Sequence, residues 1–213
     1  MLRANQAARS AYSAMIKDAN FQQPLSYEQL DINDLAGVVF PGGHDKAIKP
    51  YLESESLRKF VRKLFPQTGG EPIMPVAAIC HGVLVLARTT DAQGVSVVYQ
   101  RKLTSLPWSF ENKAWQLGKI VRFWQPDYYR TYMENLYEPV GFWGVEQELK
   151  RLTGGFCDVS KESTHYWRKT NGIHRDSSTD DRCAWVVQDG RLLTARWPGD
   201  AHTFAKRFIA LLA

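Results

Sequence analysis

The sequence predicts an α/β fold in which helices cover both faces of a mainly parallel sheet. Two short apolar runs, at 35–40 and 73–79, have the length and composition of buried strands. Each run ends in a glycine-containing turn, and apolar residues at helical spacing follow at 53–65 and after Cys80. This alternation of strand and helix is typical of a parallel sheet covered by helices.

The later part of the sequence adds further predicted strands. Short apolar runs at 95–99 and 102–106 are expected to extend the sheet. Farther along, the runs 184–188 and 191–195 flank Asp189-Gly190, which is a strong hairpin signal. We therefore expect an antiparallel hairpin close to the C-terminus.

Three later segments are expected to be helical. The stretch 111–143 is interpreted as mainly helical, with breaks at its two prolines. Residues 145–152 have an amphipathic pattern that Gly154-Gly155 would end. Asp200 is expected to cap a final helix.

Length and composition favour an intracellular protein with one core. The chain has 213 residues, of which 44% are hydrophobic. No segment is long and apolar enough to be a secretory signal or a membrane span, which favours the cytoplasm and no membrane partner. The arginine- and serine-bearing start also fits a mitochondrial segment. The net charge of +5 is spread along the chain, so nucleic-acid binding is not expected.

Three widely separated cysteines indicate neither a disulfide framework nor a metal site. Cys157 and Cys183 are expected to be packing residues, because neither lies at a helix start or beside a cationic cluster. Cys80 differs, since it lies at the turn between a strand and a helix. The N–H groups and dipole at a helix start favour a thiolate, which makes Cys80 the candidate nucleophile. The alternative is a small cysteine buried in the core.

Two turns expected at the same edge of the sheet supply the other candidate residues. Ligands bind beyond the carboxyl ends of parallel strands, where Gly42, Gly43 and the residues after Cys80 can offer N–H groups to an oxyanion. His81 is a candidate base if the turn folds its ring toward the thiol; an exposed helix residue is the alternative. Glu111 is the acid expected to return to this edge and orient the imidazole, with a surface glutamate as the alternative.

At these residues the sequence resembles the ThiJ/PfpI superfamily, within the class I glutamine amidotransferase-like folds. The resemblance extends from about residue 35 to the C-terminus. Four motifs carry it: Val38-Val39-Phe40-Pro41-Gly42-Gly43-His44, Ala78-Ile79-Cys80-His81-Gly82, Thr104-Ser105-Leu106-Pro107 leading to Glu111, and the segment from Leu192 to His202.

The resemblance implies a flavodoxin-like three-layer sandwich that is shortened at its N-terminus. It implies a single domain over 1–213, with a helical or loop segment at 1–34 and a core at 35–213 that carries an insertion around 111–143. Within the superfamily, the chain looks most like the heat-inducible, cofactor-free glyoxalases and their fungal relatives. This likeness implies that methylglyoxal or a similar small carbonyl compound is converted to a 2-hydroxy acid, without a metal or an organic cofactor.

The same resemblance implies roles for individual residues. Cys80 would be the nucleophile, His81 the base and Glu111 the orienting acid. The residues expected to hold the substrate or its oxyanion are Gly42, Gly43, His44, Gly82 and His202, and for His202 an ordinary place in the first turn of a helix is the alternative.

The chain departs from the family pattern at its start. Family members usually begin with a strand, a helix and a second strand, and an acidic residue after the first strand contacts the nucleophilic cysteine. No acidic residue before position 35 follows a convincing strand, so none is assigned this role. We expect either impaired activity or a partner subunit, as in a homodimer, that covers the open edge of the strand at 38–40.

Two other functions stay open for the same thiol. One is a non-enzymatic stress or redox-responsive protein with a reactive Cys80. The other is a peptidase or amide hydrolase, because the fold alone does not fix the reaction. Glutamine amidotransferase activity is a poor fit, since none of His165, His174 and His202 is followed by glutamate two positions later.

Overall fold

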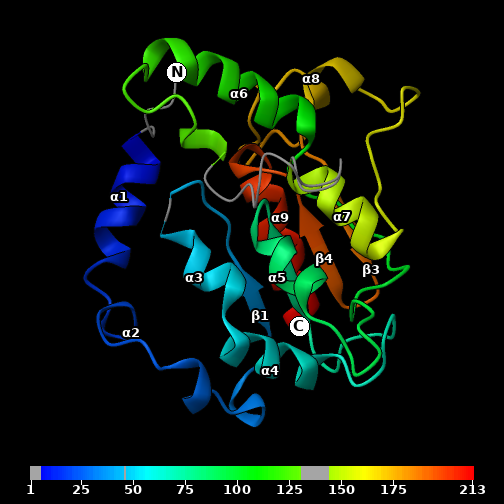
Figure 1. The fold of residues 1–213 in the computed structure, drawn as a ribbon. Helices are drawn as coiled ribbons and strands as arrows, with labels where there is room; N and C mark the ends of the chain where they lie inside the picture. The colour runs from blue at the N-terminus through cyan, green and yellow to red at the C-terminus, as the bar shows by residue number, and fades with distance from the viewer. Residues whose placement is uncertain (1–5, 46, 131–143) are drawn as a thin grey trace.

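A four-stranded sheet forms the centre of the computed structural model, which describes residues 6–45, 47–130 and 144–213 (Figure 1). The strand order is β1 (Val38–Phe40), β2 (Val76–Ile79), β4 (Leu192–Ala195) and β3 (Val186–Asp189). β1, β2 and β4 run parallel, whereas β3 is antiparallel to β4. The prediction of an α/β fold with a mainly parallel sheet is confirmed, and so is the C-terminal hairpin.

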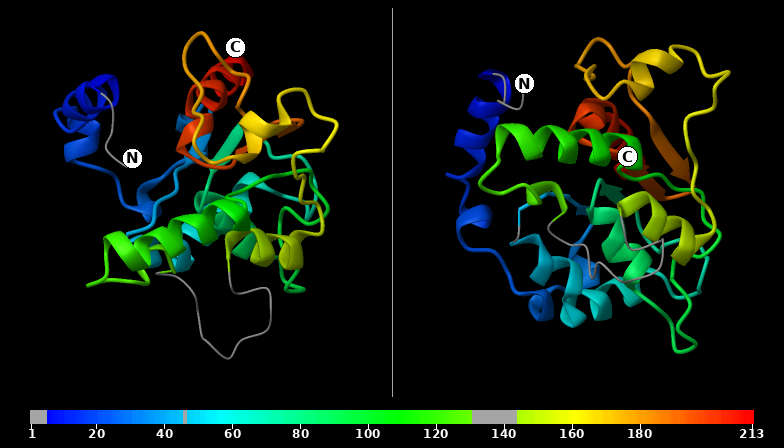
Figure 2. Two further views of the ribbon diagram at one scale, coloured as in Figure 1. Left: turned by 90° about the horizontal axis from the view of Figure 1, so that it is seen from above. Right: turned by 45° about the horizontal axis from the view of Figure 1, so that its top comes forward.

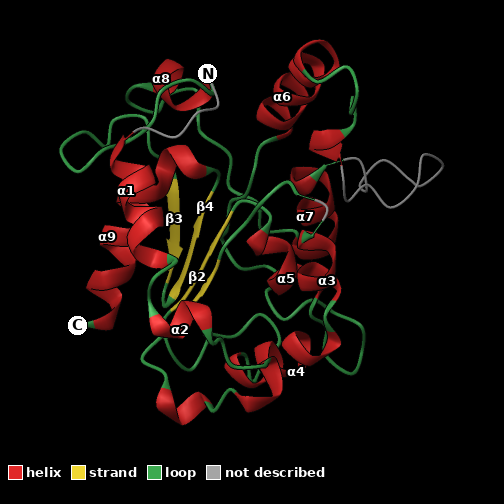
Figure 3. Cartoon of the chain, turned by 90° about the vertical axis from the view of Figure 1, so that its left-hand side faces the viewer, coloured by secondary structure: helices red, strands yellow, loops and turns green. Residues whose placement is uncertain are grey.

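Helices cover both faces of the sheet, which gives three layers (Figure 3). α5 (Gly82–Arg88) packs directly on β1 and β2, and α9 (Ala201–Leu212) packs on β4 from the other side. Around α5 lie α3 (Ile48–Glu53), α4 (Glu55–Leu64) and α7 (Val145–Thr153).

The alternation of side chains along β2 explains why both faces need a cover. Val76 and Ala78 belong to the large core beneath α5, whereas Ala77 packs with Phe204 in the smaller core beneath α9. Successive residues of a strand point to opposite faces. A continuous apolar run therefore fills two cores at once, as is typical of strands in parallel sheets.

The remaining helices lie outside these two layers or at their ends. They are α1 (Gln6–Met15), α2 (Ala19–Gln22), α6 (Trp108–Val121) and α8 (Tyr166–Thr170). Figure 2 shows α1 at the periphery of the molecule, and no residue of α1 or α2 is buried. None of the described helices has the length and hydropathy needed to cross a membrane.

Local sequence signals set the bounds of several helices. The hydroxyl of Ser54 accepts a hydrogen bond from the Leu57 N–H, so α4 begins at Glu55 and is separate from α3. Gly154 adopts a left-handed conformation with φ of 67° and ends α7, as its sequence predicts.

α7 is held against α5 by a buried pair in which Arg88 donates two hydrogen bonds to Glu148, at 2.7 and 2.9 Å.

The expected strands at 95–99 and 102–106 are wrong. Residues 97–99 lie in turns, and the pairing in this segment is a single bridge between Thr90 and Ser96. Their apolar character reflects burial, because Val97 and Val98 lie in the main core. In the second segment, the Thr104 N–H donates to the hydroxyl of Thr194, and Leu103 forms one isolated bridge with Phe156. Residues 102–106 are thus held by a hydrogen bond to a side chain and by one bridge, and not by the ladder of backbone hydrogen bonds that a strand would form.

The expected helix over 111–143 is only partly present. α6 begins at Trp108 and ends at Val121, and a single 3-10 turn follows at Tyr128–Arg130. Residues 131–143 lie outside the described part of the chain.

Asp200 precedes α9, but its side chain does not cap that helix. It binds the buried Arg196 guanidinium instead, with N–O distances of 2.7 and 2.9 Å. Asp176 replaces it by accepting the N–H groups of His202 and Thr203 in the first turn of α9. An acidic residue at the right spacing predicted the helix start but not which carboxylate serves it.

In the described part of the chain, β1 pairs with β2 and has no strand on its other side. The open edge expected for this strand is therefore present.

Gly82 allows the start of α5 to approach the end of β1. A Cβ at this position would overlap the carbonyl oxygen of Phe40, and that of Pro41 would be 2.5 Å away. Both obstacles are backbone atoms, so a side chain could fit only if the two segments moved apart.

We predict that Gly82→Ala lowers the free energy of unfolding by about 3 kcal/mol, because it overpacks this contact. Gly43→Ala is the matched control, since its Cβ would meet nothing nearer than an Ile48 methyl at 3.5 Å. The control is expected to stay within about 0.5 kcal/mol of the parent. Urea denaturation measures both variants, and equal stabilities would contradict the assigned contact.

Candidate active site

Cys80 occupies a sharp turn between β2 and α5. Its φ of 59° lies in the left-handed region, which residues other than glycine rarely adopt. The Cys80 N–H donates to the carbonyl of Ala195 at 3.0 Å, which fixes the turn to the end of β4. The sequence prediction of an elbow at this cysteine is confirmed, and the strained backbone is of the kind found at functional sites.

The loop after β1 lies directly against this elbow. A Cβ on Gly42 would be 2.7 Å from the Cys80 Cβ and 2.8 Å from the His81 nitrogen. Gly42 is itself exposed to solvent, so the cysteine lies just beneath an accessible stretch of backbone. The structure thus brings together the two turns that the sequence analysis assigned to one edge of the sheet.

The Cys80 thiol and the His81 imidazole face each other although they are neighbours in sequence. The Sγ atom is 3.2 Å from Nδ1 of the ring. His81 has no exposed surface, and burial, followed by the nearby His44, lowers its pKa well below the usual range. A neutral imidazole at this distance can accept the thiol proton.

The expectation of an exposed, ionised Cys80 is wrong. The residue is 3% exposed, and burial raises the pKa of its thiol to about 12. The negative charges of Glu111 and Asp200 act in the same direction, whereas a backbone hydrogen bond at His81 opposes them. The resting sulfur is therefore a neutral thiol beside a neutral base.

His44 brings a second imidazole to the site. Its ring centroid is 4.7 Å from that of His81, in an edge-to-face arrangement. Burial lowers the pKa of His44 to about 4, so this ring is also neutral near pH 7. The His44 residue is only half-buried, which places it between the enclosed His81 and solvent.

Tyr129 packs on the far side of His44 and was not identified from the sequence. The two ring centroids are 5.1 Å apart, and Tyr129 is 8% exposed. The sequence signal was the crowding of aromatic residues after position 107, which predicts a core or a subunit contact but selects no individual ring.

Glu111 lies in the first turn of α6 and is 1% exposed. Its Oε2 accepts the Val145 N–H at 3.1 Å, at the first residue of α7. The carboxylate therefore ties α6 to α7 while its charge raises the thiol pKa. Its assignment as the acid that orients His81 stays a prediction.

The structure places the other predicted site residues differently. Gly82 begins α5 immediately after the cysteine–histidine pair. His202 has an exposed side chain in the first turn of α9, where its N–H donates to Asp176. This contact does not involve Cys80 or His81, so it does not support a place for His202 in the substrate site.

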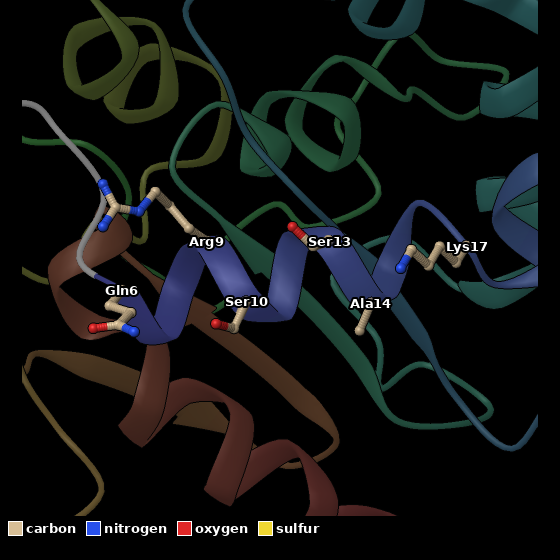
Figure 4. Close-up of a pocket in the computed structure, with 6 residues that line it drawn as sticks. All are labelled: Gln6, Arg9, Ser10, Ser13, Ala14 and Lys17. Carbon is tan, nitrogen blue, oxygen red and sulfur yellow. The ribbon is translucent and has the colours of Figure 1, made fainter.

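Two surface hollows lie away from Cys80. One, of about 530 Å³, is lined by residues from a single exposed face of α1 and the turn after it (Figure 4). The other, of about 260 Å³, lies between residues 177–181 and α9. In residues 6–45, 47–130 and 144–213, no group of three His, Cys, Asp or Glu side chains is arranged to hold a metal ion.

The burial of Cys80 predicts a specific order of thiol labelling. Iodoacetamide at pH 8 should alkylate the partly exposed Cys157 before Cys80, because the buried thiol is both shielded and protonated. Peptide mass spectrometry at timed intervals gives the order, and labelling in denaturant should remove the difference. Faster labelling of Cys80 in the folded protein would contradict the protonated state.

The lowered pKa of His44 predicts a loss of stability in mild acid. Between pH 6.5 and about 4 the unfolded chain binds a proton at His44 that the folded chain does not bind, so stability falls as pH falls. The contribution of His44 is up to about 3 kcal/mol. The His44→Asn variant should show a weaker pH dependence of unfolding than the parent over this range. His165→Asn, which makes the same change at an exposed position where φ is 59°, is the matched control.

Comparison with known proteins agrees with this architecture. The family described as ThiJ/PfpI family-like matches residues 1–151. No curated protein matches the chain. Among solved structures, Rapid Encystment Protein 24 kDa from Francisella tularensis is similar, with a TM-score of 0.60 and 18% identity over 94% of this chain and 70% of that one.

Glyoxalase III from Candida albicans is also similar, with a TM-score of 0.57 and 18% identity over 97% of this chain and 70% of that one. At such identity the likeness to either structure shows the fold. The family match covers well over half of the sequence. The chain therefore belongs to the ThiJ/PfpI-like family.

Proposed function

We propose that this protein converts small 2-oxoaldehydes, such as methylglyoxal, into 2-hydroxy acids, with Cys80 as the nucleophile. The observation that carries the proposal is the 3.2 Å contact between Cys80 Sγ and His81 Nδ1 at a strained elbow. The family and the structural likeness to a glyoxalase III support it. The chemistry needs no metal or organic cofactor, because the thiol and imidazole supply the nucleophile and the base.

The first step joins the sulfur to the aldehyde carbon. His81 accepts the thiol proton as Sγ attacks, so the negative charge passes from sulfur to the former aldehyde oxygen. The proton then returns from the imidazolium to this oxygen, which leaves a neutral hemithioacetal. No free thiolate needs to persist, which suits a thiol whose pKa is about 12.

The second step moves hydrogen between two adjacent carbons. The C–H bond of the former aldehyde carbon breaks to give an enediol, and the neighbouring carbon then receives a proton. The product is a thioester of the 2-hydroxy acid. Water cleaves this thioester, which releases the acid and restores the thiol. The net change is the addition of one water molecule, without oxidation or reduction from outside.

Backbone at the Gly42–Gly43 turn is suited to hold the oxygen that develops negative charge. Gly42 packs so closely on the Cys80 Cβ and the His81 nitrogen that only a residue without a side chain fits there. N–H groups that point at such an oxygen stabilise the transition state more than the ground state.

The burial of the sulfur favours a small substrate over the two alternatives. A polypeptide would have to reach a residue that is 3% exposed, which disfavours a peptidase. A peroxide sensor requires an accessible thiolate, whereas burial keeps this thiol protonated.

The proposal predicts lactate formation from methylglyoxal by the purified protein, without added glutathione. Cys80→Ala should abolish the activity, and His81→Gln should lower it by about 10²–10⁴-fold because the base is lost. Cys157→Ala is the matched control and should retain the parental rate. Lactate is measured enzymatically together with methylglyoxal consumption. A parent protein that is no faster than Cys80→Ala would end the proposal.

A further inference from the structure

The proposed reaction requires two separate proton transfers, one at sulfur and one at carbon. His81 Nδ1 is 3.2 Å from the thiol, so this nitrogen is placed to serve the sulfur. The transfer between the two substrate carbons needs a group that lies beside the adduct. A second titratable side chain next to the Cys80–His81 pair could therefore perform the transfer at carbon, while His81 performs the transfer at sulfur.

His44 meets the geometric requirements for this second role. It belongs to the loop whose Gly42 touches the elbow, and its ring packs edge-on to His81 at 4.7 Å. The residue is half-buried, which places it between the enclosed pair and solvent.

Tyr129 fixes the orientation of this ring from the opposite side. Its own ring lies edge-on to His44 at 5.1 Å and packs against the position of Gly118 in α6. His44 is thus held between His81 and a buried tyrosine, although it lies on a loop. A proton carrier must be positioned in this way to reach a specific carbon.

Two carboxylates near the cysteine, those of Glu111 and Asp200, accept hydrogen bonds from residues outside the Cys80–His81 pair. Glu111 accepts the Val145 N–H at the start of α7, and Asp200 binds Arg196 through both carboxylate oxygens. Both act on the thiol through their charge.

We propose that His44 carries the hydrogen between the two carbons of the substrate while His81 serves the sulfur. This inference rests on the proposed function. The neutral His44 ring takes the proton from the hemithioacetal carbon, the electron pair of that C–H bond forms a C=C bond, and the former ketone oxygen takes the negative charge of an enediolate. The resulting imidazolium gives its proton to the adjacent carbon, and the hydroxyl proton on the sulfur-bearing carbon passes to the neighbouring oxyanion, which yields the thioester of the 2-hydroxy acid and restores neutral His44. Protons and electrons balance without any further reactant.

The experiment separates adduct formation from isomerisation in the full-length protein. Methylglyoxal labelled with 13C at the aldehyde carbon reports the hemithioacetal by NMR, and lactate is measured in parallel. His44→Asn should still form the adduct but make lactate about 10²-fold or more slowly. Residual turnover should show a larger rate difference between ordinary methylglyoxal and methylglyoxal deuterated at the aldehyde carbon, because C–H cleavage becomes rate-limiting.

Two controls make the result specific. His165→Asn changes an exposed histidine to the same residue and should behave as the parent. Cys80→Ala should form no adduct. His44→Gln is a second variant of the site, which keeps a polar side chain of similar length should asparagine disturb the fold.

The outcomes distinguish this inference from the proposed function. If the parent makes lactate and both His44 variants match its rate, the inference is overturned and the proposed function stands. If both variants lose adduct and lactate together, His44 supports the structure and does not transfer the hydrogen. If the parent makes no lactate, the proposed function fails and the inference fails with it.

Discussion

The candidate site depends on the close approach of two backbone segments at the edge of the sheet. Gly82 touches the end of β1 and Gly42 touches the elbow after β2, so neither position has room for a Cβ. The chain between the end of β2 and Gly82 must turn sharply, and Cys80 in this turn has a φ of 59°. The hydrogen bond from Cys80 to Ala195 and the surrounding core maintain this strained conformation. Contact between the two turns therefore determines where the sulfur lies.

Burial determines the charge state of the Cys80 thiol and of the neighbouring imidazoles. The dipole of a helix start is worth about 0.3–1 kcal/mol toward an anion. Raising the thiol pKa from 9.0 to about 12 corresponds to about 4 kcal/mol against the thiolate. The larger effect is desolvation, so the resting site holds a neutral thiol and neutral imidazoles. A base in direct contact with the sulfur is then a requirement of any reaction that starts there.

The sequence predicted those features that depend on local patterns. The apolar runs located β1 and β2, the Cys-His-Gly string located the elbow, and Asp189-Gly190 located the hairpin. It failed where an apolar or acidic residue serves a tertiary contact. Val97 and Val98 are buried outside the sheet, and Asp200 binds Arg196 while Asp176 caps α9. The burial of Cys80 and the packing of Tyr129 on His44 arise from segments distant in sequence, which a linear pattern does not reveal.

The charges around the thiol also constrain the order of events in any attack on a carbonyl. Glu111 and Asp200 both oppose the formation of negative charge at Cys80. The same carboxylates disfavour an alkoxide that forms next to the sulfur. Stabilisation must therefore come from N–H donors at the Gly42–Gly43 turn or from a proton that arrives as the oxygen becomes basic. His81 can supply that proton, because it has just taken one from the sulfur 3.2 Å away. Bond formation and proton return are thus coupled, and an uncharged aldehyde suits this site better than an anionic substrate.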